Sequence, residues 1–287
     1  MTTAQLVNIH DKMFLVDCGE GTQTQLWKSG VKVTNMNHIF ISHAHGDHFF
    51  GLVPLISSLT LMLARTEELH LWLPENLKEP LEKDIEQYCN LSFKLIVHSV
   101  DTTKQAILYE DKEIKVETIP LNHRVPCCGF LFSEKHKLPV LLPEKCNALG
   151  IPQREFGKIK AGADWMLEDG TVVPNSELTT ASDFVPRKYA YCSDTAYYPE
   201  IIPQIQGVNL LYHEATFTTE DEQQAVNAAH STAAQAATIA RDAHVGQLAI
   251  GHYSIRYDDE TVLLAEAQRI FPNTVASQEG MKIEVKN

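Results

Sequence analysis

The chain has 287 residues, of which 44% are hydrophobic and 21% charged, a balance typical of a globular protein rather than a disordered one. Its formal net charge of −13 argues against a protein that coats nucleic acid non-specifically, although clustered basic side chains or bound cations would still allow an enzyme that acts on nucleic acid. No apolar run reaches the roughly 18 residues that a membrane-spanning helix needs, so we expect no contact with a membrane.

The first residues and the cysteines indicate the compartment. The N-terminal sequence has neither the basic segment nor the apolar core of a secretory signal. The six cysteines form no Cys-x-x-Cys pair. We therefore expect reduced thiols and a cytoplasmic protein.

Short strands alternate with helices along most of the chain, which predicts an α/β fold in a single domain over residues 1–287. In the first half we predict strands at 4–9, 14–17, 39–41, 94–99, 105–109 and 114–119, and helices at 22–28, 50–64 and, more weakly, 79–89. In the second half we predict strands at 189–192, 210–212 and 247–250, and helices at 232–243 and 260–271. Ser231 is the expected cap of the alanine-rich helix at 232–243.

The segment 143–187 differs from its surroundings. It contains repeated glycines and prolines and shows no sustained periodicity. These features predict an inserted loop or arm.

Residues 43–48 carry the strongest functional signal, since three imidazoles and one carboxylate occupy six positions between a predicted strand and a predicted helix. Imidazole nitrogens and carboxylate oxygens are ligands of a borderline cation such as zinc. Alternate residues of an extended turn point the same way, so His43 and His45 can share one ion. Asp47 and His48 then face a neighbouring position, and the sequence predicts two metals rather than one.

Further donors lie where other short apolar strands end. His123, Asp194 and His252 each follow such a strand, the usual place for site residues on a layered scaffold. Taken alone, each such residue is more often structural than a ligand. Together with the cluster at 43–48 they complete two coordination spheres.

The order of these donors resembles the ligand motifs of the metallo-β-lactamase superfamily, whose fold is a four-layer αββα sandwich. Four further motifs resemble the ribonuclease Z family within it. They are Asp17-Cys18-Gly19-Glu20-Gly21-Thr22-Gln23, the His213-Glu214-Ala215-Thr216 element, His230-Ser231-Thr232, and the segment from Gly251 to Tyr257.

The resemblance implies two zinc ions per subunit, the first held by His43, His45 and His123, the second by Asp47, His48 and His252, and both by a bridging Asp194. Manganese or iron could fit the same donors. The implied reaction removes the 3′ trailer from precursor tRNA and leaves a 3′-hydroxyl on the tRNA and a 5′-phosphate on the trailer. The implied assembly is a homodimer.

Three residues have implied catalytic roles. Asp47 would orient or deprotonate the attacking water. His230 would protonate the leaving 3′-oxygen, with Glu214 holding its tautomer. The structural alternatives are that Glu214 is a buried acid satisfying backbone donors and that His230 only begins a helix.

Two departures from the family pattern carry expectations. A further strand and a glycine-rich loop that precede the first strand in the family are missing here, so we expect an exposed sheet edge and weakened folding or activity. The segment 150–158 lacks the Gly-Pro pair of the family's tRNA-binding arm, so we expect an arm of altered form.

Two other functions compete with this interpretation. A hydrolase of the same fold could act on small phosphodiesters, sulfate esters or lactones, but it would not need the arm. A non-catalytic tRNA-binding or scaffold protein would not need every ligand and both acid–base candidates, all of which are present.

Overall fold

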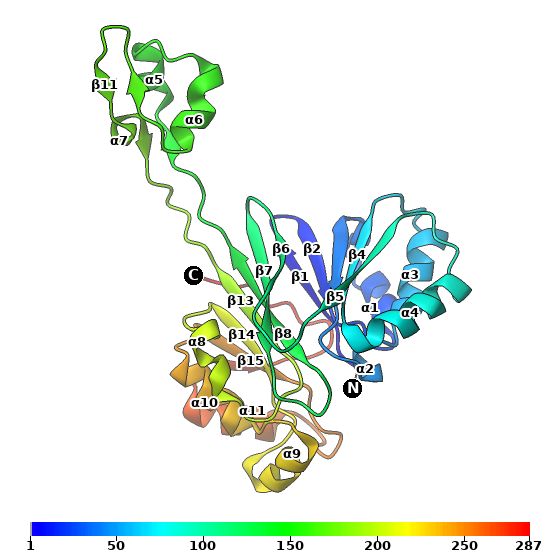
Figure 1. Ribbon diagram of the computed structural model, residues 1–287. Coiled ribbons are helices and arrows are strands. Elements are labelled where there is room, and N and C mark those ends of the chain that lie inside the picture. The colour runs from blue at the N-terminus through cyan, green and yellow to red at the C-terminus, as the bar shows by residue number, and fades with distance from the viewer. Residues whose placement is uncertain (1) are drawn as a thin grey trace. The chain divides into compact units, whose positions relative to one another are not determined.

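The computed structural model describes residues 2–287. They form two compact units, of which the first comprises the chain up to Glu134 together with Arg187 onward, and the second comprises Lys135–Pro186 (Figure 1). Within the described residues no helix is long and apolar enough to cross a membrane.

The first sheet has five strands in sequence order. They are β1 (Gln5–Ile9), β2 (Lys12–Val16), β3 (Met36–Phe40), β4 (Leu69–Pro74) and β5 (Leu95–Val100). β1 and β2 form an antiparallel hairpin, and the other neighbours are parallel. One face packs on helices that present leucines and isoleucines to it. The helical segments are α1 (Thr22–Lys28), the 3-10 turn η1 (Val33–Asn35), α2 (Gly46–Phe49), α3 (Leu52–Leu61) and α4 (Glu75–Tyr88).

The second sheet has seven strands in the order β16-β15-β14-β13-β8-β7-β6. Their bounds are β6 (Ile107–Glu110), β7 (Ile114–Pro120), β8 (Cys128–Glu134), β13 (Lys188–Cys192), β14 (Leu210–Glu214), β15 (Gln247–Gly251) and β16 (Thr274–Ala276). β13 to β16 are parallel, whereas β6, β7, β8 and β13 pair antiparallel. The helical segments of this half are η3 (Pro199–Ile201), α8 (Ile202–Ile205), η4 (Thr219–Asp221), α9 (Glu222–Ala228), α10 (Ala233–Asp242) and α11 (Thr261–Ile270).

The two sheets pack face to face through an aromatic core. Phe14 and Phe40 of the first sheet share a buried cluster with Phe130, Phe132 and Tyr191 of the second. Because side chains alternate along a strand, the neighbouring positions of these strands face the helices instead. The helices therefore lie outside the two sheets (Figure 1), which is the predicted four-layer αββα arrangement.

The second unit has a small core of its own, formed by Cys146, Ile151, Ile159 and Leu178. Its elements are β9 (Val140–Leu141), α5 (Pro143–Ala148), the 3-10 turn η2 (Gln153–Glu155), α6 (Phe156–Lys160), β10 (Trp165–Met166), β11 (Val172–Val173), α7 (Asn175–Leu178) and β12 (Thr179–Thr180). It overlaps the segment that the sequence marks as an arm. The tRNA-binding role of that segment stays a prediction.

Hydrogen bonds explain why the predicted starts of two helices were wrong. The capping residue of α10 is Thr232, whose hydroxyl accepts the backbone N–H of Gln235, while Ser231 donates to the Thr195 carbonyl. The helix predicted over 50–64 is interrupted at Gly51, whose N–H donates to the Cys18 carbonyl at 2.8 Å. A Cβ at Gly51 would lie 2.2 Å from the Gly19 carbonyl oxygen, so only glycine permits this approach.

Candidate metal centre

The predicted site residues gather at one end of the two sheets of the first unit. Most follow the carboxyl ends of parallel strands, which meet at the same edge of a sheet. Residues 43–48 follow β3 and continue into α2, Asp194 follows β13, Glu214 ends β14, and His252 follows β15. Figure 1 shows α2 and α9 at this end of the sheets. His123, in the loop after β7, and His230, between α9 and α10, complete the set.

Four donors form the first group. His45 Nδ1 lies 3.1 Å from His43 Nε2 and 3.4 Å from His123 Nε2. Asp194 Oδ2 lies 3.5 Å from His43 Nε2 and 3.9 Å from His123 Nε2. Ligands of a tetrahedral zinc ion stand roughly 3–4 Å apart, so these spacings fit one ion.

Asp47, His48 and His252 form the second group together with the other oxygen of Asp194. Asp194 Oδ1 lies 3.4 Å from both His48 Nε2 and His252 Nε2. Asp47 Oδ2 lies 3.5 Å from the same two nitrogens. The two oxygens of Asp194 therefore face different donor groups, as a bridging ligand requires.

The electrostatic environment of the centre favours the binding of positive charge. His48 Nε2 is buried and has no hydrogen-bond partner among residues 2–287. Burial alone would lower the pKa of His252, but the carboxylates of Asp194 and Asp47 raise it to about 9. Burial would likewise raise the pKa of Asp194, yet the surrounding histidines hold it well below its usual range. The donor set thus suits bound cations.

Hydrogen bonds on the far side of the rings orient three of these histidines. The Nδ1 atom of His43 lies 2.9 Å from Ser42 Oγ, that of His48 lies 2.7 Å from Asp17 Oδ2, and that of His123 lies 2.8 Å from the Ala229 carbonyl oxygen. Each contact fixes the orientation of the ring and leaves Nε2 directed at the centre, as binding of a metal through Nε2 requires.

Asp17 is the buried hub of these contacts. Its Oδ1 accepts the backbone N–H of Ser42 at 2.8 Å. Its Oδ2 accepts from the Ser42 hydroxyl at 2.9 Å and from the Tyr191 hydroxyl at 2.5 Å, in addition to His48. Every partner of Asp17 can donate, so the position suits a side chain that offers acceptor oxygens. Its φ of 57° is tolerated by aspartate better than by most residues.

Glu214 and His230 form a buried pair beside the second group. Glu214 Oε1 accepts from His230 Nδ1 at 2.7 Å and from the backbone N–H groups of Thr195 and Ser231. Burial opposes ionisation, but the hydrogen bond and charge of His230 hold the Glu214 pKa below its usual value. Glu214 thus accepts hydrogen bonds from backbone N–H groups, as expected of a buried structural acid, and it also contacts His230. The His230 and His252 rings stack with centroids 5.3 Å apart.

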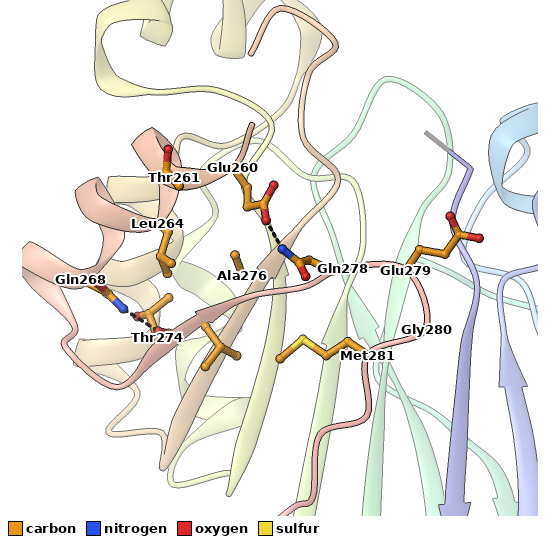
Figure 2. A pocket seen from close by; sticks show the side chains of 11 residues that line it. Glu260, Thr261, Leu264, Gln268, Thr274, Ala276, Gln278, Glu279, Gly280 and Met281 are labelled. Carbon is orange, nitrogen blue, oxygen red and sulfur yellow. Dashed lines mark hydrogen bonds between the residues drawn. The ribbon is translucent and has the colours of Figure 1, made fainter. Parts of the chain in front are cut away.

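A cavity of about 620 Å³ lies elsewhere, between α11, β16 and residues 277–281 (Figure 2). Leu264 and Met281 contribute apolar atoms to its lining, and Gln278 donates to Glu260 at its rim. None of the predicted site residues lines it. The candidate chemistry is therefore in the histidine-rich centre rather than in this cavity.

Comparison with known proteins agrees with this geometry. The chain is 49% identical to a ribonuclease Z of Bacteroides fragilis over 284 residues, which cover 99% of this chain and 93% of the relative. It is 45% identical to a ribonuclease Z of Porphyromonas gingivalis over 284 residues, with the same coverage. This chain belongs to the ribonuclease Z family.

Solved structures identify the fold of this chain, and one family model matches part of it. The ribonuclease Z family member described here superposes on the short form of human tRNase Z with a TM-score of 0.71 at 24% identity, covering 100% of this chain and 93% of the human one. The metallo-β-lactamase fold protein YhfI from Bacillus subtilis gives 0.67 at 19% identity, covering 98% and 90%. Residues 1–139 also match the family described as anti-Pycsar protein Apyc1. The predicted metallo-β-lactamase fold is confirmed.

The structure brings all nine sequence-predicted site residues to one centre. Sequence reasoning missed Ser42 and the Ala229 carbonyl, which contact ligand rings from behind, and Tyr191, which donates to Asp17. None of the three has a signature of its own in the sequence. It also assigned no role to Thr216, although this residue is part of a quoted motif.

Replacing Asp17 with asparagine places an NH₂ group among donors. We expect the free energy of unfolding of the metal-free protein to fall by about 1–3 kcal/mol and zinc affinity to fall about 10- to 100-fold. Urea denaturation and a zinc competition titration measure these effects. Asp84→Asn, on the exposed face of α4, is the matched control and should change neither. A wild-type midpoint and wild-type zinc affinity for Asp17→Asn would contradict this role.

Proposed function

We propose that this protein is a zinc-dependent endoribonuclease that removes the 3′ trailer from precursor tRNA, leaving a tRNA 3′-hydroxyl and a trailer 5′-phosphate. The observation that carries the proposal is the arrangement at Asp194, whose two oxygens face two separate donor groups while the Glu214–His230 pair lies alongside. Membership of the ribonuclease Z family supports the substrate.

The proposed first ion would be held by His43, His45, His123 and Asp194, and the second by Asp47, His48, His252 and Asp194. Two bound zinc ions would supply activation of water and neutralisation of charge on the phosphoryl oxygens. Manganese or iron would fit the same donors.

Asp47 is suited to orient the attacking water. Its side chain is 41% exposed, whereas those of Asp194 and His48 are buried. Burial opposes its ionisation, but the hydrogen bond and charge of His252 lower the Asp47 pKa to about 2. Asp47 is therefore a carboxylate at neutral pH, and it can accept a hydrogen bond from water on its open side.

His230 is suited to protonate the leaving oxygen. Its Nδ1–H donates to the Glu214 carboxylate, so Nε2 is the atom that remains for a proton delivered to substrate. A ribose 3′-oxygen is a poor leaving group and benefits from such a donor.

The remaining parts of the proposal concern binding. We propose that Lys135–Pro186 grips the tRNA, since its exposed Arg154 and Lys158 offer contacts to phosphate. We also propose that the protein works as a homodimer in the cytoplasm. Exposed Leu61 and Met62 at the end of α3 are suitable for a subunit contact.

Incubation with a precursor tRNA tests the function directly. We expect one cut 3′ of the discriminator nucleotide, with a 3′-hydroxyl on the tRNA and a 5′-phosphate on the trailer. A chelator should abolish the cut, because it removes the cations from the donor groups. Added zinc should refill these sites and restore the cut. End-group analysis of both products is the measurement. No cleavage by fully zinc-loaded protein would reject the proposal.

Replacing His230 with alanine separates its two candidate roles. If His230 protonates the leaving oxygen, kcat on precursor tRNA should fall about 10²- to 10⁴-fold. Hydrolysis of bis(p-nitrophenyl) phosphate should change little, because p-nitrophenolate leaves without a proton. Steady-state kinetics on both substrates measure the difference. Equal losses on both would indicate that His230 only maintains the structure.

Excision of Lys135–Pro186 tests the proposed arm. β8 and β13 are antiparallel neighbours, with Ser133 paired to Lys188 and Glu134 N–H donating to the Arg187 carbonyl. An Asn-Gly turn can therefore join Glu134 to Arg187. We expect KM for precursor tRNA to rise about tenfold or more, since phosphate contacts supply much of the affinity. Hydrolysis of bis(p-nitrophenyl) phosphate should be unchanged, and an unchanged KM for precursor tRNA would count against the arm.

A further inference from the structure

Thr216 lies between the acid pair and the proposed second metal position. It follows β14 by two residues, and its side chain is buried. Its Oγ1 lies 2.8 Å from Glu214 Oε2, 3.0 Å from His252 Nδ1 and 2.9 Å from the His252 carbonyl oxygen. It also lies 3.3 Å from His230 Nδ1. One hydroxyl thus contacts both members of the acid pair and a proposed metal ligand.

The direction of these hydrogen bonds follows from counting protons. A threonine hydroxyl has one proton to donate and two lone pairs with which to accept. Glu214 Oε2 and the His252 carbonyl oxygen can only accept, so the single proton goes to one of these oxygens. His252 Nδ1 must therefore donate to Thr216, which places its ring proton on Nδ1.

In the neutral ring, the form in which a histidine binds a metal, this assignment leaves a lone pair on His252 Nε2. That atom lies 3.4 Å from Asp194 Oδ1 and 3.5 Å from Asp47 Oδ2. A lone pair aimed at two carboxylate oxygens is repulsive, so this nitrogen binds a proton in the metal-free protein or a metal cation in the loaded one. The same tautomer is the one in which a histidine binds metal through Nε2.

The backbone at His252 supports a fixed ring. Its φ of 60° is unfavourable for a histidine, and Ser254 N–H donates to the Thr216 carbonyl at 3.1 Å. The two loops that carry Thr216 and His252 are therefore tied together through backbone and side chain.

We propose that Thr216 is a positioning residue that fixes the tautomer of His252 and links the Glu214–His230 pair to the second metal position. The inference rests on the proposed function only in taking zinc as the occupant. Because one hydroxyl contacts both parts, its removal should disturb metal binding as well as proton delivery.

Three proteins test the proposal: wild type, Thr216→Ser, which keeps the hydroxyl, and Thr216→Val, which keeps the shape without it. Zinc stoichiometry and affinity are measured by competition with a chromophoric chelator, without RNA. We expect Thr216→Val to bind one of its two zinc ions about 10- to 100-fold more weakly, while the other ion serves as an internal control. Thr216→Ser should bind both ions as wild type does.

The tautomer itself is measured by NMR of protein labelled with ¹⁵N-histidine. In the zinc-loaded wild type and the zinc-loaded Thr216→Ser variant, His252 should carry its single ring proton on Nδ1. Wild-type zinc binding by Thr216→Val, or equal losses in both variants, would overturn the proposal. A wild-type protein that binds zinc but leaves precursor tRNA intact would instead refute the proposed substrate, and the expected order of zinc affinities would still stand.

Discussion

The buried carboxylate of Asp194 imposes the main constraint on this structure. Its side chain is only 3% exposed, and its two oxygens face His43 and His123 on one side and His48 and His252 on the other. An ionised carboxylate at such depth is tolerated only where positive charge or donors surround it. The histidines supply part of that charge. Their nitrogens that face the centre could bind cations, which would supply the rest.

The fold brings these groups together from distant parts of the chain. Residues 43–48 come from the first sheet and Asp194 from the second, so the centre exists only when the two sheets pack face to face. A hydrogen bond between the two sheets supports this packing. Tyr191 of β13 donates its hydroxyl proton to Asp17, which directly follows β2 of the first sheet. The aromatic core and the polar centre are thus connected through one tyrosine.

Sequence patterns predicted the parts of the molecule that local chemistry determines. The strand–turn–helix around residues 43–48 and the strand-end positions of Asp194 and His252 follow from short apolar runs that end in polar donors. β8 and β4 were not predicted. β8 is buried along its whole length, although it ends in Ser133 and Glu134. The Glu134 carboxylate is buried because Arg187, from a distant part of the chain, donates to it. Because both faces of β8 are buried, its sequence does not show the alternation of apolar and polar residues that marks a half-buried strand.

The site was less predictable where function depends on contacts distant in sequence. His45 faces the centre through Nδ1, whereas His43 and His123 use Nε2, and this choice depends on ring orientations set by tertiary contacts. Thr216 gains its importance only because His252, 36 residues away, comes within hydrogen-bond distance. Its motif identifies the residue but not what its hydroxyl contacts.

A bridging role for Asp194 between two metal ions is tested most directly by a crystal structure of the zinc-loaded protein, with anomalous scattering recorded at the zinc absorption edge. We expect two peaks about 3.5–4 Å apart. One should lie among His43, His45 and His123, the other among Asp47, His48 and His252, with one oxygen of Asp194 bound to each. A single peak, or two peaks that Asp194 does not bridge, would show that Asp194 does not hold two zinc ions.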